Sequence, residues 1–207
     1  MDLLNNIHIK SIEGILQQVG ERIEGNLVCD IEPTNYVLSR NIDKVKNLQF
    51  LCKGKQRICE IGVNACHSLL IMLLENPTAE YLVFDLNNHR YTEPCMQYIR
   101  RAFPTANIKT VYGNSIETVR RYIHEHAEEL HTYDLCHIDG GHTPDVFTAD
   151  FENIRYLSKK GSPVIFDDYD MGDIRAFVDA KIASNDIAKY EYTDLIKTMY
   201  HFIFWYV

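Results

Sequence analysis

Six polar side chains stand at the ends of five short apolar runs of the sequence. They are Glu60, Asp85, Asn114, Asp139 and the neighbouring pair Asp167 and Asp168. Ligands bind outside the carboxyl ends of the strands in an open parallel sheet, so strands at these runs would bring all six side chains to one crevice. The alternative is that they only begin loops, as polar residues often do.

Three of these residues are carboxylates that would meet at neighbouring strand ends, namely Asp139, Asp167 and Asp168. Such charges repel one another unless a cation lies between them. Ligation by oxygen alone favours Mg²⁺, with Mn²⁺ or Ca²⁺ as other candidates, over zinc. The alternative is that Asp167 and Asp168 cap a turn while Asp139 binds a backbone amide.

A histidine follows closely in the segment DGGH, where His142 lies three residues after Asp139. The intervening glycines could place its imidazole beside the metal ion. A metal ion lowers the pKa of a hydroxyl group, and a histidine with a pKa near 6.5 can accept the proton. The alternative role of His142 is to cap the next helix. His137, on the same strand face as Asp139, is interpreted as a core residue.

The first turn, residues 62–66, indicates which ligand the crevice could hold. Gly62 allows a sharp turn after the strand, and the helix that follows offers free N–H groups at its start. A dinucleotide fold would have the spacing G-x-G-x-x-G, whereas here Cys66 stands four positions after Gly62. Asp85, at the end of the next strand, could accept hydrogen bonds from both hydroxyls of a ribose. An adenosine-containing ligand is therefore predicted.

The elements that position these residues are read from alternating patterns. The runs RICEIG, AEYLVFDL, IKTVYG, YDLCHIDG and SPVIFDD are each followed by a helix-like segment, which predicts βαβ units and a mostly parallel sheet. Two further strand-like runs near residues 188–207 have no helix between them and are expected to pair antiparallel at one sheet edge. The first fifty residues have a helical pattern and are expected to form a cap.

Composition limits the partners of the chain. It has 207 residues and a formal net charge of −8 at pH 7, without a stripe dense in Lys and Arg, which argues against nucleic acid. The longest apolar runs are too short to span a bilayer, so no membrane partner is expected. The six cysteines form no CxxC pair, which favours reduced thiols and a cytoplasmic location.

Taken together and in this order, the segments resemble the class I S-adenosylmethionine-dependent methyltransferases over roughly residues 57–170. EIGVNACHS is similar to the first motif, Glu-Ile-Gly-x-Asn-Ala-Gly-His-Ser, of the metal-dependent branch of small-molecule and sugar O-methyltransferases, which includes macrolide-sugar O-methyltransferases. FDLNNHRY, YGNSIETV, HIDGGHTPDV and IFDDYD resemble the second to fifth segments of that branch. The resemblance implies S-adenosylmethionine as cofactor, with Mg²⁺ or Mn²⁺.

The same resemblance assigns roles to residues. It implies that Glu60 and Gly62 border the methionine part of the cofactor, that Asp85 holds the ribose, and that Asn114 and Ser115 lie near the adenine. The predicted cofactor-binding residues are Glu60, Gly62, Asn64, Cys66, Ser68, Asp85, Asn114, Ser115 and Asp139. The predicted metal ligands are Asp139, Asp167 and Asp168, and the predicted catalytic residues are His142, as the general base, and Asp139.

Two positions depart from the pattern of the branch. Asn114 stands where aspartate is common, although an amide can still hydrogen-bond an adenine. Cys66 stands where a glycine lets cofactor atoms approach the backbone, so its side chain could crowd the cofactor or require unfavourable φ values.

We expect one methyltransferase domain over residues 1–207, with a helical cap at 1–50 and a core at 57–207. The core is expected to be a Rossmann-like, doubly wound, seven-stranded mixed sheet, with five parallel strands and a C-terminal antiparallel pair. Its predicted reaction is metal-assisted O-methylation of a small molecule, for which a sugar or nucleotide sugar is a candidate. A homodimer could form through an apolar edge strand at the C-terminus.

Two alternatives stay open at this point. One is a non-catalytic binding or assembly module, in which Cys66 has closed the cofactor cleft. The other is a metal-dependent hydrolase that uses the three aspartates and His142 with water instead of a methyl acceptor.

Overall fold

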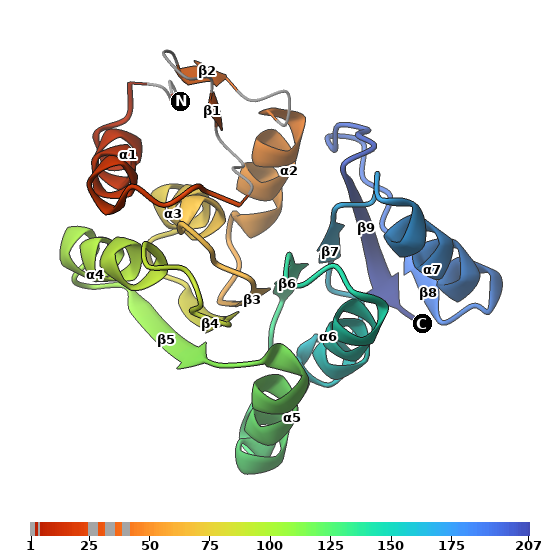
Figure 1. Ribbon diagram of the computed structural model, residues 1–207. Helices are drawn as coiled ribbons and strands as arrows, with labels where there is room; N and C mark the ends of the chain where they lie inside the picture. Colours follow the sequence, from red (N-terminus) through yellow and green to blue (C-terminus); the bar gives the residue numbers. More distant parts are fainter. Residues whose placement is uncertain (1–2, 4, 25–28, 32–35, 39–41) are drawn as a thin grey trace.

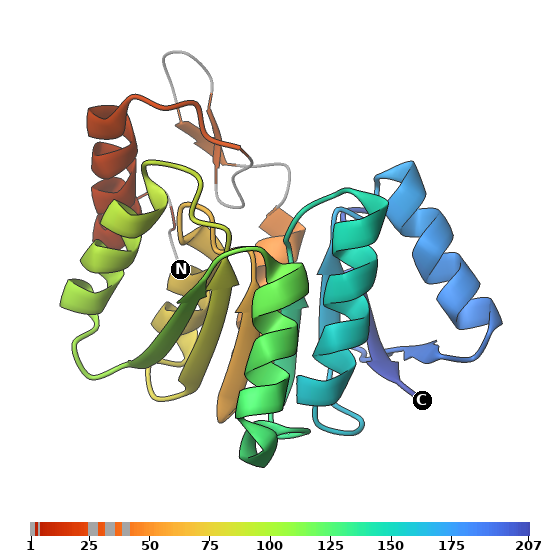
Figure 2. The ribbon, with the colours of Figure 1, turned by 60° about the horizontal axis from the view of Figure 1, so that its bottom comes forward.

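The computed structural model describes residues 3, 5–24, 29–31, 36–38 and 42–207, and for residues 29–31 and 36–38 the backbone only. A seven-stranded sheet forms the centre of this structure (Figures 1 and 2). Its strands are β3 (Arg57–Ile61), β4 (Glu80–Asp85), β5 (Asn107–Tyr112), β6 (Leu135–Ile138), β7 (Val164–Asp167), β8 (Ile187–Lys189) and β9 (His201–Tyr206). Their spatial order is β5-β4-β3-β6-β7-β9-β8.

The direction of the strands follows the sequence pattern. Strands β3 to β7 are parallel to one another, and β9 is antiparallel to both of its neighbours, β7 and β8. The order of strands reverses between β3 and β6, because β4 and β5 continue on one side and β7 on the other. The predicted mixed sheet is confirmed, and a ligand crevice belongs at this reversal.

Helices cover both faces of the sheet (Figure 1). They are α1 (Ile7–Val19), α2 (Ile42–Cys52), α3 (His67–Glu75), α4 (Thr92–Ala102), α5 (Ser115–Glu125), α6 (Pro144–Leu157), α7 (Gly172–Ala183) and the short 3₁₀ helix η1 (Ala127–Glu129). Helices α1 to α4 pack in one apolar cluster and α5 to α7 in a second one on the opposite face. Successive strand residues contribute to opposite clusters, as Ile58 and Cys59 do, because side chains alternate along a strand.

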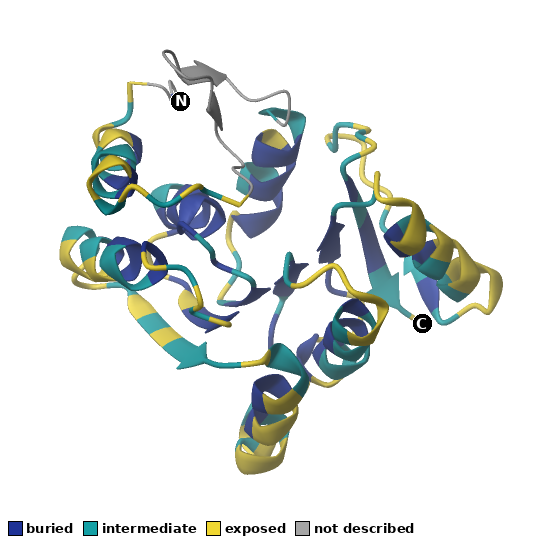
Figure 3. Ribbon diagram, viewed as in Figure 1, coloured by how far each residue is buried: buried dark blue, intermediate teal, exposed yellow. Residues whose placement is uncertain are grey.

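Helix α3 is buried along most of its length, as Figure 3 shows. Residues 67–73 of this helix are all buried, because the helix packs against the sheet, α1 and α2 together. The helices at the mouth of the crevice have clear start signals. The Asn114 side chain accepts a hydrogen bond from the N–H of Ile116 at the start of α5, and Pro144 is the first residue of α6.

Two parts of the chain differ from the sequence-based expectation. The N-terminal cap contains α1 and most of α2, but it also has a two-stranded antiparallel sheet of β1 (Cys29–Ile31) and β2 (Tyr36–Leu38). Such three-residue strands are too short to leave a periodic pattern. The aromatic strand β9 lies between β7 and β8 and not at the edge, so the edge is the short β8. The antiparallel pair at one sheet edge is confirmed, and the homodimer stays a prediction, with β8 as its edge strand.

Two further observations concern the surface and the thiols. Within the described residues, no helix has the combination of length and apolarity that crossing a bilayer requires. The five cysteines with described side chains are all buried and unpaired.

Candidate active site

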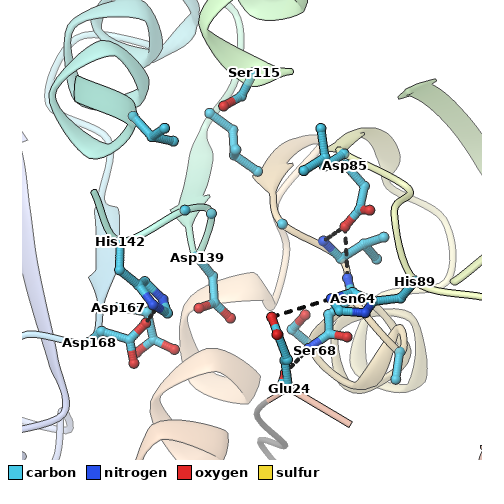
Figure 4. Close-up of a pocket in the computed structure, with 18 of the residues that line it drawn as sticks. Glu24, Asn64, Ser68, Asp85, His89, Ser115, Asp139, His142, Asp167 and Asp168 are labelled. Atoms are coloured by element: carbon cyan, nitrogen blue, oxygen red, sulfur yellow. Dashed lines mark hydrogen bonds and ion pairs between the residues drawn. The ribbon is translucent and has the colours of Figure 1, made fainter. Parts of the chain in front are cut away.

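A cavity of about 710 Å³ opens at the carboxyl ends of the central parallel strands, at the reversal between β3 and β6 (Figure 4). This volume is in the range of pockets that hold a small ligand or cofactor. The predicted site residues that line it are Gly62, Asn64, Ser68, Asp85, Asn114, Ser115, Asp139, His142, Asp167 and Asp168. Two other predicted residues, Glu60 and Cys66, do not line it.

Asp85 fixes the turn after β3. One oxygen of its carboxylate, Oδ2, accepts hydrogen bonds from the N–H groups of Val63 at 2.8 Å and Asn64 at 2.9 Å. The other oxygen, Oδ1, accepts from the N–H of Asn87 at 2.7 Å. A carboxylate has about four acceptor positions. Asp85 can therefore hold the turn in place and still accept a hydrogen bond from a hydroxyl group of a ligand in the cavity.

Gly62 is required by a close approach of two loops. It has a φ of 87°, and a Cβ atom at this position would lie 1.9 Å from the carbonyl oxygen of Asp139. The turn after β3 therefore packs directly on the end of β6. This contact sets the spacing between the predicted cofactor turn and the acidic cluster.

Cys66 immediately precedes α3 in the left-handed conformation, with φ 66° and ψ 18°. Its side chain is fully buried in the apolar cluster on the α1–α4 face, and burial raises the pKa of the thiol well above its usual range. The CH₂–SH group therefore lies in the core and not in the cavity. Of the two penalties expected for Cys66, the structure shows the unfavourable φ value.

Two polar atoms in the cavity wall lack partners. Oδ1 of Asn64 and Nε2 of His67 are buried, and neither has a hydrogen-bond partner among the described residues. Burial lowers the pKa of His67 to about 4, so its imidazole is neutral at pH 7. The amide nitrogen of Asn64 donates to the carbonyl oxygen of Glu24, which brings the N-terminal segment to the cavity mouth. Oδ1 of Asn64 can accept a hydrogen bond from a ligand, and Nε2 of His67 can accept or donate one according to its tautomer.

Three carboxylates gather on the opposite side of the cavity, as predicted from the strand ends. Asp139 follows β6, Asp167 ends β7 and Asp168 follows it, and Figure 4 shows the three side chains facing the same space. Burial and the charge of Asp167 raise the pKa of Asp139 well above its usual range. Negative charges this close require compensation, either by cations or by a bound proton.

A lysine from the cap supplies one of these cations. Lys44, on α2, forms an ion pair with Oδ2 of Asp167, and the two side chains are 8% and 2% exposed. Burial lowers the pKa of Lys44, but the charges of Asp167, Asp139 and Asp168 outweigh it, so the net shift is upward. Lys44 also lines the cavity. Nothing in the sequence distinguishes it from the nearby Lys46, so sequence reasoning could not select it.

A second buried cation lies behind the cavity wall. Nδ1 of His137 is 3.0 Å from Oε1 of Glu60, its register neighbour on β3. Burial lowers the pKa of His137, but the hydrogen bond to Glu60 and the charge of Asp139 raise it to about 9 overall. His137 is buried, as predicted, but as an imidazolium in a polar network. Glu60 acts on this histidine and has no direct contact with the cavity.

His142 and Asp168 form a pair at the cavity rim. Nε2 of His142 lies 2.7 Å from Oδ2 of Asp168, and the side chain of His142 is 51% exposed. The hydrogen bond to Asp168 raises the pKa of His142, although partial burial opposes it. Because Nε2 is held in this way, Nδ1 is the ring nitrogen that can exchange a proton with a ligand.

The carboxylate cluster can be tested for its fit to a divalent metal ion. His137, Asp139 and Asp167 offer ligand atoms within 4.8 Å of one another. However, Lys44 occupies one oxygen of Asp167, His142 occupies one oxygen of Asp168, and Glu60 holds Nδ1 of His137. As arranged, the residues do not fit a divalent ion.

The fold and the crevice define the class of the protein, a methyltransferase domain of the Rossmann-like type. Residues 59–169, more than half of the chain, match the sequence profile of a family described as a methyltransferase domain, and the chain belongs to this family. The predicted class is confirmed. No curated protein matches the chain.

Solved structures share the fold over nearly the whole chain. The O-methyltransferase from Bacillus cereus, solved in complex with SAH, is 18% identical with a TM-score of 0.63, and the match covers 94% of this chain and 88% of that one. TomG from Streptomyces achromogenes, an O-methyltransferase solved with SAM, is 14% identical with a TM-score of 0.63, covering 97% and 88%. The cofactor-bound Rv0187 from MTB is 14% identical with a TM-score of 0.66, covering 97% and 88%.

Proposed function

We propose that the protein transfers a methyl group from S-adenosylmethionine to a hydroxyl group of a small molecule. The observation that carries this proposal is the position of two features in one cavity. On one side of the cavity, Asp85 can accept a hydrogen bond from a ribose hydroxyl. On the other side, His142, held by Asp168, can accept a proton. Two of the similar folds are O-methyltransferases whose structures contain SAM or SAH, which supports the choice of cofactor.

The residues of the cavity fit this cofactor. The acceptor position that remains on Asp85 suits a ribose hydroxyl, and the unpartnered atoms of Asn64 and His67 suit the polar methionine end. Asn114 and Ser115, at the start of α5, line the region assigned to the adenine. When bound, S-adenosylmethionine supplies a sulfonium methyl group that an oxygen can take while the C–S electron pair returns to sulfur.

The chain itself handles the proton of the acceptor hydroxyl. Nδ1 of His142 accepts this proton, and Asp168 holds the ring through Nε2 and stabilises the imidazolium that forms. Lys44 and Asp139 line the same cavity beside this pair. Because positioning supplies much of the acceleration in a transfer of this kind, the walls of the cavity need only align the groups and exclude water.

The acceptor is proposed from the motifs. Their resemblance to sugar O-methyltransferases favours a hydroxyl of a sugar or nucleotide sugar. The proposed steps use no metal ion, because Lys44 and His142 already pair with the acidic cluster. The hydrolase alternative leaves Asp85 and the Gly62 turn without a role. The non-catalytic alternative needs a cleft closed by Cys66, whose side chain lies in the core.

The first experiment is a calorimetric titration of S-adenosylmethionine and of its demethylated product, S-adenosylhomocysteine, into the purified full chain. We expect micromolar binding of both. If either binds, release of the demethylated product is then measured with a panel of sugars and nucleotide sugars. Absence of binding for both would contradict the proposed function and favour a non-catalytic module.

A further inference from the structure

Lys44 has an unusual position for a lysine. It is 7% exposed, and its ammonium group faces three carboxylates at the carboxyl ends of β6 and β7. Lysine side chains are almost never buried unless they are paired. Here the ion pair with Asp167 provides the partner, and Asp139 and Asp168 contribute further negative charge.

The fold anchors Lys44 through its own helix. Asn47 lies one turn further along α2, on the same face. Its amide nitrogen donates to the carbonyl oxygen of Ile196 at 2.8 Å and lies 2.9 Å from Nε2 of His201, while its Oδ1 accepts from the N–H of Ile196 at 2.8 Å. His201 is the register neighbour of Asp167 in the sheet. These contacts fix α2 beside β7 and β9 and hold Lys44 at the acidic cluster.

We propose that the ammonium group of Lys44 takes the place of a divalent metal ion at Asp139, Asp167 and Asp168. The cluster then needs no metal to keep its carboxylates together. In the cavity, the same ammonium group is available to stabilise negative charge that develops on the acceptor oxygen when its proton moves to His142. This last role rests on the proposed function, whereas the replacement of the metal ion does not.

One atom makes the proposal testable. Oδ1 of Asp167 is buried and has no hydrogen-bond partner among the residues that the structure describes. If the ammonium group of Lys44 were removed, this oxygen and its neighbours would form an uncompensated carboxylate site. Such a site attracts a hard cation with oxygen ligands.

The experiment measures Mn²⁺ binding to the full chain by the loss of the electron paramagnetic resonance signal of the free ion. The unmodified protein is expected to bind no Mn²⁺ at the cluster up to about 1 mM. Lys44→Met, which keeps the length of the side chain without its charge, is expected to bind Mn²⁺ at least about tenfold more tightly. Lys46→Met is the matched control, because Lys46 is exposed on the same helix and pairs with Asp43 at the surface. It should behave as the unmodified protein.

Two results would overturn the proposal. One is tight Mn²⁺ binding by the unmodified protein that Asp167→Asn abolishes, which would show a metal site with Lys44 displaced. The other is a folded Lys44→Met variant without any gain in Mn²⁺ binding. The first result can be read even if Lys44→Met does not fold. Neither measurement needs the cofactor or turnover, so failure here is separate from failure of the proposed methyl transfer.

Discussion

Nε2 of His142 lies 2.7 Å from Oδ2 of Asp168, and this contact joins the loops that follow β6 and β7. Asp168 reaches the histidine from a left-handed backbone position, with φ 54°, which aspartate and asparagine tolerate better than most residues. A carboxylate that holds one imidazole nitrogen directs the other toward the substrate. The pair is therefore the part of the cavity from which the mechanism can be tested directly.

Removal of the imidazole should abolish most turnover. We expect His142→Ala to lower kcat by about 10²- to 10⁴-fold, the usual contribution of a general base. The affinity for S-adenosylhomocysteine, measured by calorimetry, should stay unchanged because Asp85 and the turn after β3 are intact. Equal turnover of the variant and the unmodified enzyme with a true acceptor would rule out His142 as the base.

The pH dependence of turnover should move when Asp168 is changed. The hydrogen bond to Asp168 raises the pKa of His142, so the neutral base forms only at higher pH and kcat/KM should rise with pH through this raised pKa. In Asp168→Asn the pKa of His142 should fall back toward its ordinary value. The rising limb of the pH profile should then shift to lower pH, while the plateau rate decreases. A profile that does not move would contradict the role of Asp168.

Asp85→Asn should weaken cofactor binding through the turn. The carboxylate accepts hydrogen bonds from three backbone N–H groups. The amide of asparagine has only one oxygen, so its NH₂ group would face at least one of these donors. We expect a loss of about 1–3 kcal/mol in the free energy of unfolding and a clear loss of S-adenosylhomocysteine affinity.

Asp134→Asn is the matched control for this variant. Asp134 also accepts backbone N–H groups, from Gln56 and Arg57, but at the opposite end of the sheet. It should lose a similar amount of stability and keep the cofactor affinity. Equal affinities of the two variants for S-adenosylhomocysteine would remove Asp85 from the cofactor site.

Cys66 can be tested by two small substitutions. Cys66→Gly loses a buried side chain but relieves a left-handed conformation that costs a residue with a Cβ atom about 1–2 kcal/mol. Cys66→Ala loses the sulfur and keeps the unfavourable φ value. In urea unfolding, the glycine variant should therefore be at least as stable as the alanine variant. Neither should change cofactor affinity, and a large gain for glycine would show that the thiol does crowd the ligand.

His67 should make the fold sensitive to acid. Burial lowers its pKa from 6.5 to about 4, so the unfolded chain takes up a proton that the folded chain excludes. The contribution of the neutral His67 to the free energy of unfolding is fully present above pH 6.5. It is lost as the pH decreases toward 4, and the loss amounts to about 3 kcal/mol. Urea unfolding should show a smaller loss over this window in His67→Gln. His124→Gln, which changes an exposed histidine, should retain the full loss.

Local patterns in the sequence determined the strands, their parallel direction and the residues at their carboxyl ends. A strand's apolar run and the turn after it are encoded by adjacent residues. Asp85, Asp139, Asp167 and His142 could therefore be placed at one crevice without a structure.

Only the tertiary structure decided which charges meet. Lys44 reaches Asp167 from a different part of the chain, and Glu60 pairs with His137 across neighbouring strands. The tertiary structure also decided the direction of the Cys66 side chain and the insertion of β9 between β7 and β8. These relationships depend on side-chain direction and on pairing between distant segments, which no local pattern records. The ion pair between Lys44 and Asp167 at the acidic cluster therefore depends on the docking of α2.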